Sequence, residues 1–332
     1  MAPKVIVRMA NFSDYLGILE MGDMFEGMDY MQHKFHKYIA DPRIYGVVAE
    51  VDQKVVGFLY FVILDGKTVM SGGARTHPQY RHRGILKMMG GFMHQFLREK
   101  FESKEILQEF RLHISNDPLP VALEKEEGVF LTRWRYLVRI STISDLAHML
   151  KRGQAIPTLI TNMSQTGESV RPLSLEEVLG LLSPEIKEKF FPHDCIVAFE
   201  IMYPLTKTNL EKMLEDNFLL FGHTENKELM GVSVVTWYPC KLGTALQFHY
   251  FGNGEHSLIQ TLSVVLQSYC SQWYTAGEVT LELYFPEELN STIIANWLDT
   301  LPELRQVPKP LGRFLVAATI NKFHKEVVKG KI

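Results

Sequence analysis

Apolar and polar residues alternate in blocks along the first 76 residues and predict a strand, two helices and three further strands. The stretch KVIVRMA, residues 4–10, is typical of a strand. Residues 13–22 begin at Ser13, a good helix N-cap, and carry apolar residues at helical spacing; a second helix is predicted over residues 30–39. Three strands follow in succession, over the stretches IYGVVAEV, KVVGFLYFVIL and KTVMSGGART.

The turns between these three strands predict an antiparallel meander. Asp52-Gln53 lies at the first turn, and Asp65-Gly66, a strong hairpin signal, lies at the second. The helical pattern GILKMMGGFMHQFLREKF comes next, with an apolar face formed by Ile85, Met88, Met89, Phe92 and Phe96. A strand, EILQEFRLHI, a short helix around LPVALEKEE and a strand, VFLTRWRYLVRIS, then complete a unit over residues 1–142. We predict an α/β fold for it, with a mixed, largely antiparallel sheet and flanking helices.

The same order of elements recurs after residues 143–168, a polar and irregular stretch that we interpret as a connector. ESVRPLSLEEVLGLL resembles the start of the chain, with a strand, a cap and leucines at helical spacing. Three strand patterns, a long helix, EHSLIQTLSVVLQSYCSQWY, and a strand, helix and strand follow. We therefore predict that residues 169–332 form a second unit with a degenerate copy of the same fold.

Composition narrows the classes of partner. The 332 residues, 46% of them apolar, suffice for two packed domains, and the net charge of −3 argues against a nucleic-acid partner. Three cysteines, Cys195, Cys240 and Cys270, are too scattered for a disulfide framework or a zinc site, and no third ligand accompanies His33 and His36, so no metal is expected. The longest apolar run is about half of a membrane span, and the first 20 residues lack the apolar core of a signal peptide. We expect a cytoplasmic protein with no membrane partner.

One short stretch, HPQYRHRGILKMM, carries candidate chemistry. Arg81, His82 and Arg83 precede Gly84 where a strand turns into the long helix. Several backbone N–H groups and the positive end of the helix dipole converge at such a turn, and a glycine lets an anion approach closely. The turn predicts a site for a pyrophosphate, although a solvated loop at a helix start is the alternative.

The turn resembles that of the GNAT superfamily of acetyl-coenzyme A-dependent N-acetyltransferases, whose motif is Q/R-x-x-G-x-G/A at this strand–helix junction. Leu86 stands where the superfamily has a small residue. The resemblance implies a GNAT fold for residues 1–142 and acetyl-CoA as co-substrate. It also implies a set of cofactor-binding residues: Ala74, Arg75, Thr76, Arg81, His82, Arg83, Gly84, Ile85, Leu86 and Asn116.

The stretch MFEGMDYMQHKFHKYIADPR resembles the vertebrate histidine N-acetyltransferase family, at Gly27, Asp29, Tyr30, Asp41 and Arg43. This resemblance implies N-acetylation of a small free amine or amino acid, with L-histidine, giving N-acetylhistidine, as the first guess. The acceptor-binding candidates are Asp29, Tyr30 and Arg75. The catalytic candidates are Glu26 and Tyr30.

Two alternatives remain open at this stage. The chain could acetylate protein N-termini or lysines, which would need an open groove. It could also be an acyl-CoA-binding protein with a lapsed active site. The second alternative is favoured by Gly72, which stands where many superfamily members have a glutamate on the fourth strand, and by Leu123 or Glu124, where many have a tyrosine.

Overall fold

The structure of the chain is a computed structural model. It describes residues 4–22, 27–101, 108–114, 128–140, 168–191, 193–199, 201–272, 278–299, 304–306 and 313–320. Among the helices of these ranges, none is both long enough and apolar enough to cross a bilayer.

The first half contains the predicted antiparallel meander, which its second, third and fourth strands form, together with three further strands. The six strands follow in chain order. They are β1 (Val5–Met9), β2 (Ile44–Val51), β3 (Lys54–Leu64), β4 (Thr68–Thr76), β5 (Gln108–Ile114) and β6 (Gly128–Ile140). The pairs β2–β3 and β3–β4 are antiparallel, and β5 lies parallel to β4. Both turns of the meander use left-handed backbone, at Asp52, Gln53, Asp65 and Gly66, as the twist of a tight hairpin requires.

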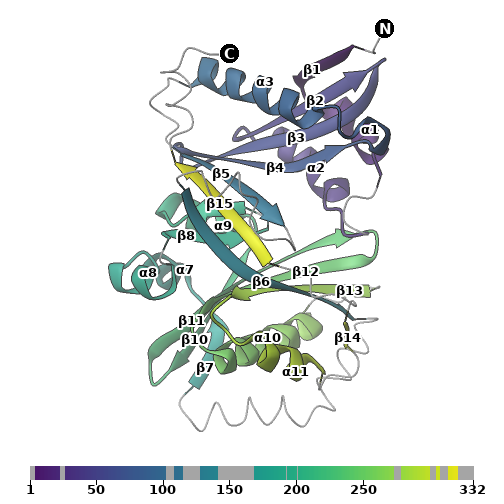
Figure 1. The fold of residues 1–332 in the computed structure, drawn as a ribbon. Helices are drawn as coiled ribbons and strands as arrows, with labels where there is room; N and C mark the ends of the chain where they lie inside the picture. The colour runs from purple at the N-terminus through teal and green to yellow at the C-terminus, as the bar shows by residue number, and fades with distance from the viewer. Residues whose placement is uncertain are drawn as a thin grey trace.

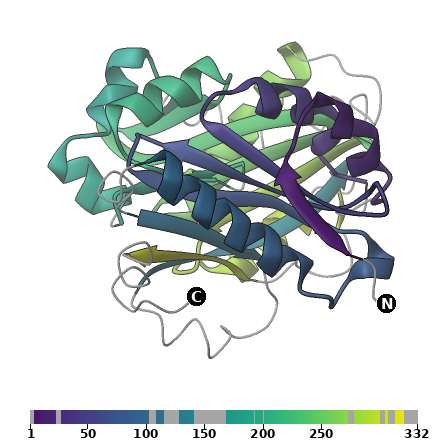
Figure 2. The ribbon, with the colours of Figure 1, turned by 90° about the horizontal axis from the view of Figure 1, so that it is seen from above.

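Helices cover both faces of this sheet. They are η1 (Phe12–Asp14), α1 (Tyr15–Leu19), α2 (Met31–Ala40), η2 (Pro78–Tyr80) and α3 (Ile85–Lys100). Because side chains alternate along a strand, β3 packs one set of residues against α1 and α2 and the other set against α3. This double burial explains the unbroken apolar run of β3, and Figure 2 shows α3 lying across its face of the sheet.

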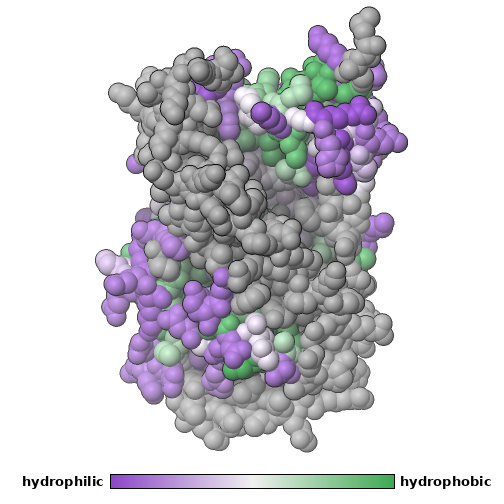
Figure 3. Space-filling view, in the orientation of Figure 1, coloured by the Kyte–Doolittle hydropathy of each residue, from purple (hydrophilic) through white to green (hydrophobic). Residues whose placement is uncertain are grey.

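Two local predictions in this half were wrong. The first helical turn is capped by Asn11, not Ser13, in a reciprocal capping box with Asp14. The buried stripe of α3 is spaced by four residues: Ile85, Met89, Met93 and Leu97. Met88, predicted on that face, is 43% exposed. Figure 3 accordingly shows hydrophobic residues among hydrophilic ones on the surface over α3 and β1.

The second half repeats the order of the first with insertions. Its elements are β7 (Glu168–Pro172), α7 (Leu175–Gly180), α8 (Pro184–Phe190), β8 (Cys195–Ala198), β9 (Ile201–Pro204), α9 (Lys207–Glu215), β10 (Leu219–Glu225), β11 (Glu228–Cys240), β12 (Gly243–Gly252), α10 (Glu255–Gln272), β13 (Glu278–Pro286), α11 (Ser291–Asp299), β14 (Leu304–Gln306) and β15 (Arg313–Ile320). The small β8–β9 hairpin, α8, α9 and the short β14 were not predicted from the sequence. Helices α10 and α11 pack on one face of the sheet. Helices α7, α8 and α9 and the β8–β9 hairpin pack on the other face.

Two strands are exchanged between the halves. In the described part of the chain the sheet is continuous, in the order β1-β2-β3-β4-β5-β15-β6-β13-β12-β11-β10-β7, with β14 beside β6. Strand β15, from the end of the second half, lies between β5 and β6, and β6 continues the ladder to β13. Figure 1 shows β6 and the yellow β15 side by side across the middle of the molecule. Each half therefore completes its sheet with a strand of the other.

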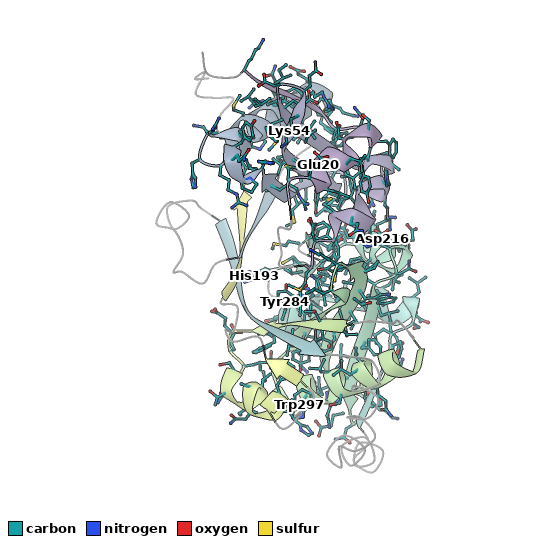
Figure 4. All side chains as sticks on the ribbon, turned by 90° about the vertical axis from the view of Figure 1, so that its right-hand side faces the viewer. Glu20, Lys54, His193, Asp216, Tyr284 and Trp297 are labelled. Atoms are coloured by element: carbon teal, nitrogen blue, oxygen red, sulfur yellow. The ribbon has the colours of Figure 1, made fainter. Side chains whose placement is uncertain are left out.

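A hydrophobic core shared by both halves lies on the α1–α2 side of the sheet. Tyr30, Met31 and Tyr60 of the first half belong to the same buried cluster as Phe199 and Tyr238 of the second. An ion pair joins the halves at the edge of this core. It lies between Lys37 on α2 and Asp216 after α9 (2.8 Å), and Figure 4 labels Asp216.

Candidate functional site

Strands β4 and β5 part from each other halfway along β4. Their register joins Thr68 to Gln108, Val69 to Glu109 and Met70 to Phe110, and within the described residues it goes no further. Both strands nevertheless continue, β4 to Thr76 and β5 to Ile114. The β5-facing backbone groups of residues 71–76 therefore have no partner on β5, and an extended ligand could pair with them as an added strand.

A β-bulge distorts β4 at the point of separation. Phe58 is paired with Arg75 and Tyr60 with Gly72, so one residue of β3 lies opposite the two residues Gly73 and Ala74. Gly73 has a left-handed φ of 64°. A bulge of this kind re-aims backbone groups, and bulges are frequent next to active sites.

The bulge depends on glycines because Tyr60 lies against it. A Cβ on Gly72 would come within 2.5 Å of the Tyr60 hydroxyl oxygen, and one on Gly73 within 2.6 Å of its ring. The space that a side chain at position 72 would occupy is therefore filled by a tyrosine from the neighbouring strand.

The predicted anion turn follows directly after β4. The chain passes through η2 and has left-handed backbone at His82 (φ 61°) and at Gly84 (φ 74°), which precedes α3. A Cβ on Gly84 would meet no atom within 4 Å. Glycine is thus favoured here for its backbone conformation. No side chain caps α3 at Gly84, so the first N–H groups of this helix face the turn without a side-chain acceptor.

A cavity of about 380 Å³ lies between the end of β4, this turn and the start of α3. It is lined by Ala74, Arg75, Thr76, Tyr80, Arg81, His82, Gly84, Ile85, Leu86 and Lys87. It thus brings together the predicted cofactor residues other than Arg83 and Asn116. Tyr80 and Lys87 were missed by the sequence analysis. Backbone donors and the cations Arg81 and Lys87 suit an anionic ligand, so the residues present fit a pyrophosphate.

Two predicted cofactor-binding residues, Arg83 and Asn116, are not among the described residues that line the cavity. The Arg83 guanidinium stacks over the Tyr80 ring, 5.0 Å from its centroid. Arg83 therefore supports the cavity wall through an aromatic contact. Asn116 lies outside the described residues.

On the opposite side of the bulge, Arg75 forms an ion pair with Asp29. Nη1 donates to Oδ2 (2.6 Å) and Nη2 donates to Oδ1 (3.1 Å). Oδ1 also accepts from the Met31 N–H (2.9 Å) at the start of α2. The Arg75 side chain thus lies beside Asp29, another predicted acceptor-binding residue. Its guanidinium binds the Asp29 carboxylate, whereas the sequence suggested that it would bind a carboxylate of the acceptor.

Tyr30, predicted to contact the acceptor, is 3% exposed and packs against the second half. Its ring meets those of Phe199 (5.1 Å between centroids) and Tyr238 (6.1 Å) edge-on. Nearby, Leu242 N donates to Gly27 O (3.4 Å), so the β11–β12 turn covers this segment. Glu26, the other catalytic candidate, lies outside the described residues.

A second, smaller cavity of about 50 Å³ lies between α2 and β9. Burial lowers the pKa of Lys34 there, and the charge of Lys37 lowers it further. The rings of Tyr38 and Tyr60, 5.0 Å apart, lie between this cavity and the bulge. We therefore treat it as separate from the candidate site. No group of three His, Cys, Asp or Glu residues suited to a metal ion occurs among the residues described.

The corresponding place in the second half is closed. Strands β12 and β13 stay paired from Gly243–Glu278 to His249–Tyr284. The β11–β12 register has no bulge, and α10 begins with the acidic Glu255. Neither an open pair of strands nor a basic turn is present here.

No protein-family model matches the chain. Among curated proteins, the human "Probable N-acetyltransferase 16" is 24% identical over 213 residues, which cover 62% of this chain and 54% of that protein. The "Histidine N-acetyltransferase" of Xenopus tropicalis is 27% identical over 86 residues, 26% of each chain. The chain thus spans about half the length of the first relative and about a quarter of the second.

Several solved structures share the fold. A tandem GNAT protein from the clavulanic acid biosynthesis pathway superposes with a TM-score of 0.54 at 13% identity, over 96% of this chain and 98% of that one. A GCN5-related N-acetyltransferase from Sphaerobacter thermophilus gives 0.54 at 12% identity, over 95% of each chain. The predicted resemblance and fold class are confirmed: the chain has the GNAT fold, over a length that matches a tandem GNAT protein.

Proposed function

We propose that the chain is an acetyl-CoA-dependent N-acetyltransferase that acts on the amino group of a small free amine or amino acid. The observation that carries the proposal is the parting of β4 from β5 beside a bulge, with the basic turn and its cavity at the end of the same strand. The GNAT fold and the similarity to curated N-acetyltransferases support it.

Each part of the cofactor has suitable residues. The N–H groups of residues 82–86, with Arg81 and Lys87, would hold the pyrophosphate. The edge of β4 at Ala74, Arg75 and Thr76, which is not paired with β5, would pair with the pantetheine arm. Asn116 completes the proposed set, from the resemblance. Bound acetyl-CoA would supply an activated acetyl thioester, and the bulge N–H groups at Gly73 and Ala74 would be the donors for its carbonyl oxygen.

The acceptor would lie on the α2 side of the bulge, beside Asp29 and Tyr30. An α-amino group titrates at about 7.7–8.0, so a useful fraction is neutral near neutral pH without a strong base. Glu26 and Tyr30 remain the proposed catalytic residues. L-histidine is the first acceptor to test, because the Xenopus relative is named a histidine N-acetyltransferase.

The proposal also extends to organisation and setting. Residues 1–142 would bind acetyl-CoA, residues 143–168 would connect, and residues 169–332 would shape the acceptor side without binding a second cofactor. A reducing, cytoplasmic setting agrees with the three cysteines of the sequence, which are too scattered for a disulfide framework. A small acceptor agrees with the contact of Leu242 over Gly27, which covers the α2 side.

The full chain can be tested with acetyl-CoA and a panel of amino acids, amines and peptides, by following release of free CoA and identifying products by mass spectrometry. We expect acetylation of a small free amine. Acetylation of peptide N-termini or lysines alone would favour a protein acetyltransferase. Acetyl-CoA binding with no transfer to any acceptor would favour a lapsed acyl-CoA-binding protein, and absence of binding would overturn the proposal.

A further inference from the structure

Arg75 heads the largest fully buried side chains of the described residues, at 1% exposure. It lies opposite Phe58, on the face of β4 that packs toward α2. Removing a guanidinium from water is costly unless its charge and its N–H groups are satisfied. Within the described part of the chain, the Arg75 guanidinium donates three hydrogen bonds to two residues, Gly73 and Asp29, and both lie at the candidate site.

The first partner is the bulge itself. Arg75 Nε donates to the carbonyl oxygen of Gly73 (3.3 Å). That carbonyl and the N–H of Ala74 belong to one rigid peptide plane and point in opposite directions. A bond that holds the Gly73 oxygen therefore also sets the direction of the Ala74 N–H. Because Gly73 is a glycine with positive φ, its own backbone restrains this plane less than another residue would.

The second partner is the start of α2. The Asp29 carboxylate accepts hydrogen bonds from both terminal nitrogens of Arg75. Its Oδ1 also accepts from the N–H of Met31. Asp29 is 46 positions away in sequence, and its side chain is 18% exposed. The two hydrogen bonds from Arg75 to Asp29 form a fork, and this fork fixes the position of the start of α2 relative to the bulge of β4.

We infer that Arg75 is a positioning residue that couples the acceptor side of the site, at Asp29 and α2, to the orientation of the Ala74 N–H on the acyl side. The inference rests on the proposed function, since it names the bulge donor as part of the acetyl-transfer site. It differs from direct substrate binding, in which the Arg75 guanidinium would hold a carboxylate of the acceptor.

Two acceptors that differ only by a carboxylate separate these roles. For a histidine-acetylating enzyme the pair is histidine and histamine; for another preferred amino acid it is that acid and its decarboxylated amine. The test variants are Arg75→Lys, which keeps the charge but loses the fork, and the charge-neutral double variant Arg75→Met/Asp29→Asn. With a positioning role, kcat falls roughly ten- to a hundredfold for both acceptors. Acetyl-CoA affinity by calorimetry stays within about threefold, because the proposed contact of Arg75 with the cofactor is through its backbone, which each variant keeps, and the turn is intact.

A coupled pair also predicts non-additivity. The Arg75→Met/Asp29→Asn variant should lose no more activity than Arg75→Met alone, since either single change breaks the same fork. Loss of activity on the amino acid with full activity on the amine would overturn the inference in favour of carboxylate binding. A lower Tm with unchanged kcat per folded molecule would overturn it in favour of a purely structural pair.

A readout independent of turnover keeps the inference testable if the chain transfers no acetyl group. Hydrogen exchange of a peptide that spans residues 71–76 is measured without acetyl-CoA in the wild type, Arg75→Lys and Asp29→Asn. Faster exchange of these amides in both variants, with unchanged exchange in α10, is the expected result. Unchanged exchange at residues 71–76 would overturn the coupling, whereas failure of transfer in the wild type alone would count against the proposed function.

Discussion

Gly84 serves the turn through its backbone conformation. Its φ of 74° favours glycine, while no neighbour lies where a Cβ would stand. Gly84→Asp adds strain of roughly 1–2 kcal/mol and places a negative charge beside the proposed pyrophosphate. We expect at least a hundredfold loss of acetyl-CoA affinity by calorimetry. Gly91→Asp, at an open position on α3, is the matched control and should bind normally. Wild-type affinity in Gly84→Asp would remove the basis for the anion turn.

Asp14 illustrates a buried charge that is well compensated. Burial alone would raise its pKa, but hydrogen bonds from Arg8 and the Asn11 N–H outweigh burial and lower the pKa below its ordinary value. A lowered pKa means that the ionised group stabilises the fold above about pH 4, and that this contribution is lost as the pH falls through the folded-state value.

Asp14→Asn should therefore cost about 0.5–2 kcal/mol of unfolding free energy at pH 7. The difference from the wild type should shrink below pH 4. Urea denaturation at pH 7 and pH 3 measures both values. A difference that stays constant between these pH values would show that the charge of Asp14 does not stabilise the first helical turn.

At the scale of elements, β3 and β4 fit together through a tyrosine and two glycines. Gly72→Ala would place a methyl group 2.5 Å from the Tyr60 hydroxyl oxygen. We expect a loss of about 1–3 kcal/mol, as for other overpacked cores. The double variant Gly72→Ala/Tyr60→Val should lose less stability than the sum of the losses of the two single variants, since the smaller side chain makes room for the methyl group. Thermal unfolding of the three variants tests this, and strictly additive losses would contradict the proposed clash.

Local signals in the sequence predicted these elements well, whereas pairings between distant residues were not accessible. The meander was predictable because Asp52-Gln53 and Asp65-Gly66 encode left-handed turns within a few residues. The bulge depends instead on how β3 meets β4 across a turn, and no local pattern marks Gly73 as its centre. For the same reason, the sequence suggested Asp29 and Arg75 separately as acceptor contacts, but could not predict their ion pair.

At the scale of the whole molecule, the two halves are unequal in what they can bind. The second half keeps β12 and β13 paired and places Glu255 at the start of α10, where its carboxylate accepts from the Asn290 N–H (2.7 Å). Closed strands and a negative charge both disfavour a pyrophosphate. We expect calorimetry to show one acetyl-CoA bound per chain. The Gly84→Asp variant should show no second site in place of the weakened one. A stoichiometry of two would contradict this assignment.

The exchange of β6 and β15 makes the halves depend on each other. Strand β15 pairs with β5 from Phe314–Ile114 to Ile320–Gln108 and with β6 on its other edge. A fragment of residues 1–150 would lack β15 and leave the edge of β5 exposed beside the cofactor site. A fragment of residues 151–332 would lack β6, the neighbour of β13. Unpaired edges of this kind are prone to misassembly.

We therefore expect neither fragment alone to bind acetyl-CoA, and the two co-expressed fragments to restore binding as a one-to-one complex. The interrupted chain should bind within about tenfold of the intact chain, because a cut between residues 150 and 151 removes no strand pairing of the described residues and costs only the entropy of association. Gel filtration gives the stoichiometry and calorimetry gives the affinity. If the fragment of residues 1–150 alone binds acetyl-CoA as tightly as the full chain, β15 is dispensable, and the exchanged strands serve stability without shaping the cofactor site.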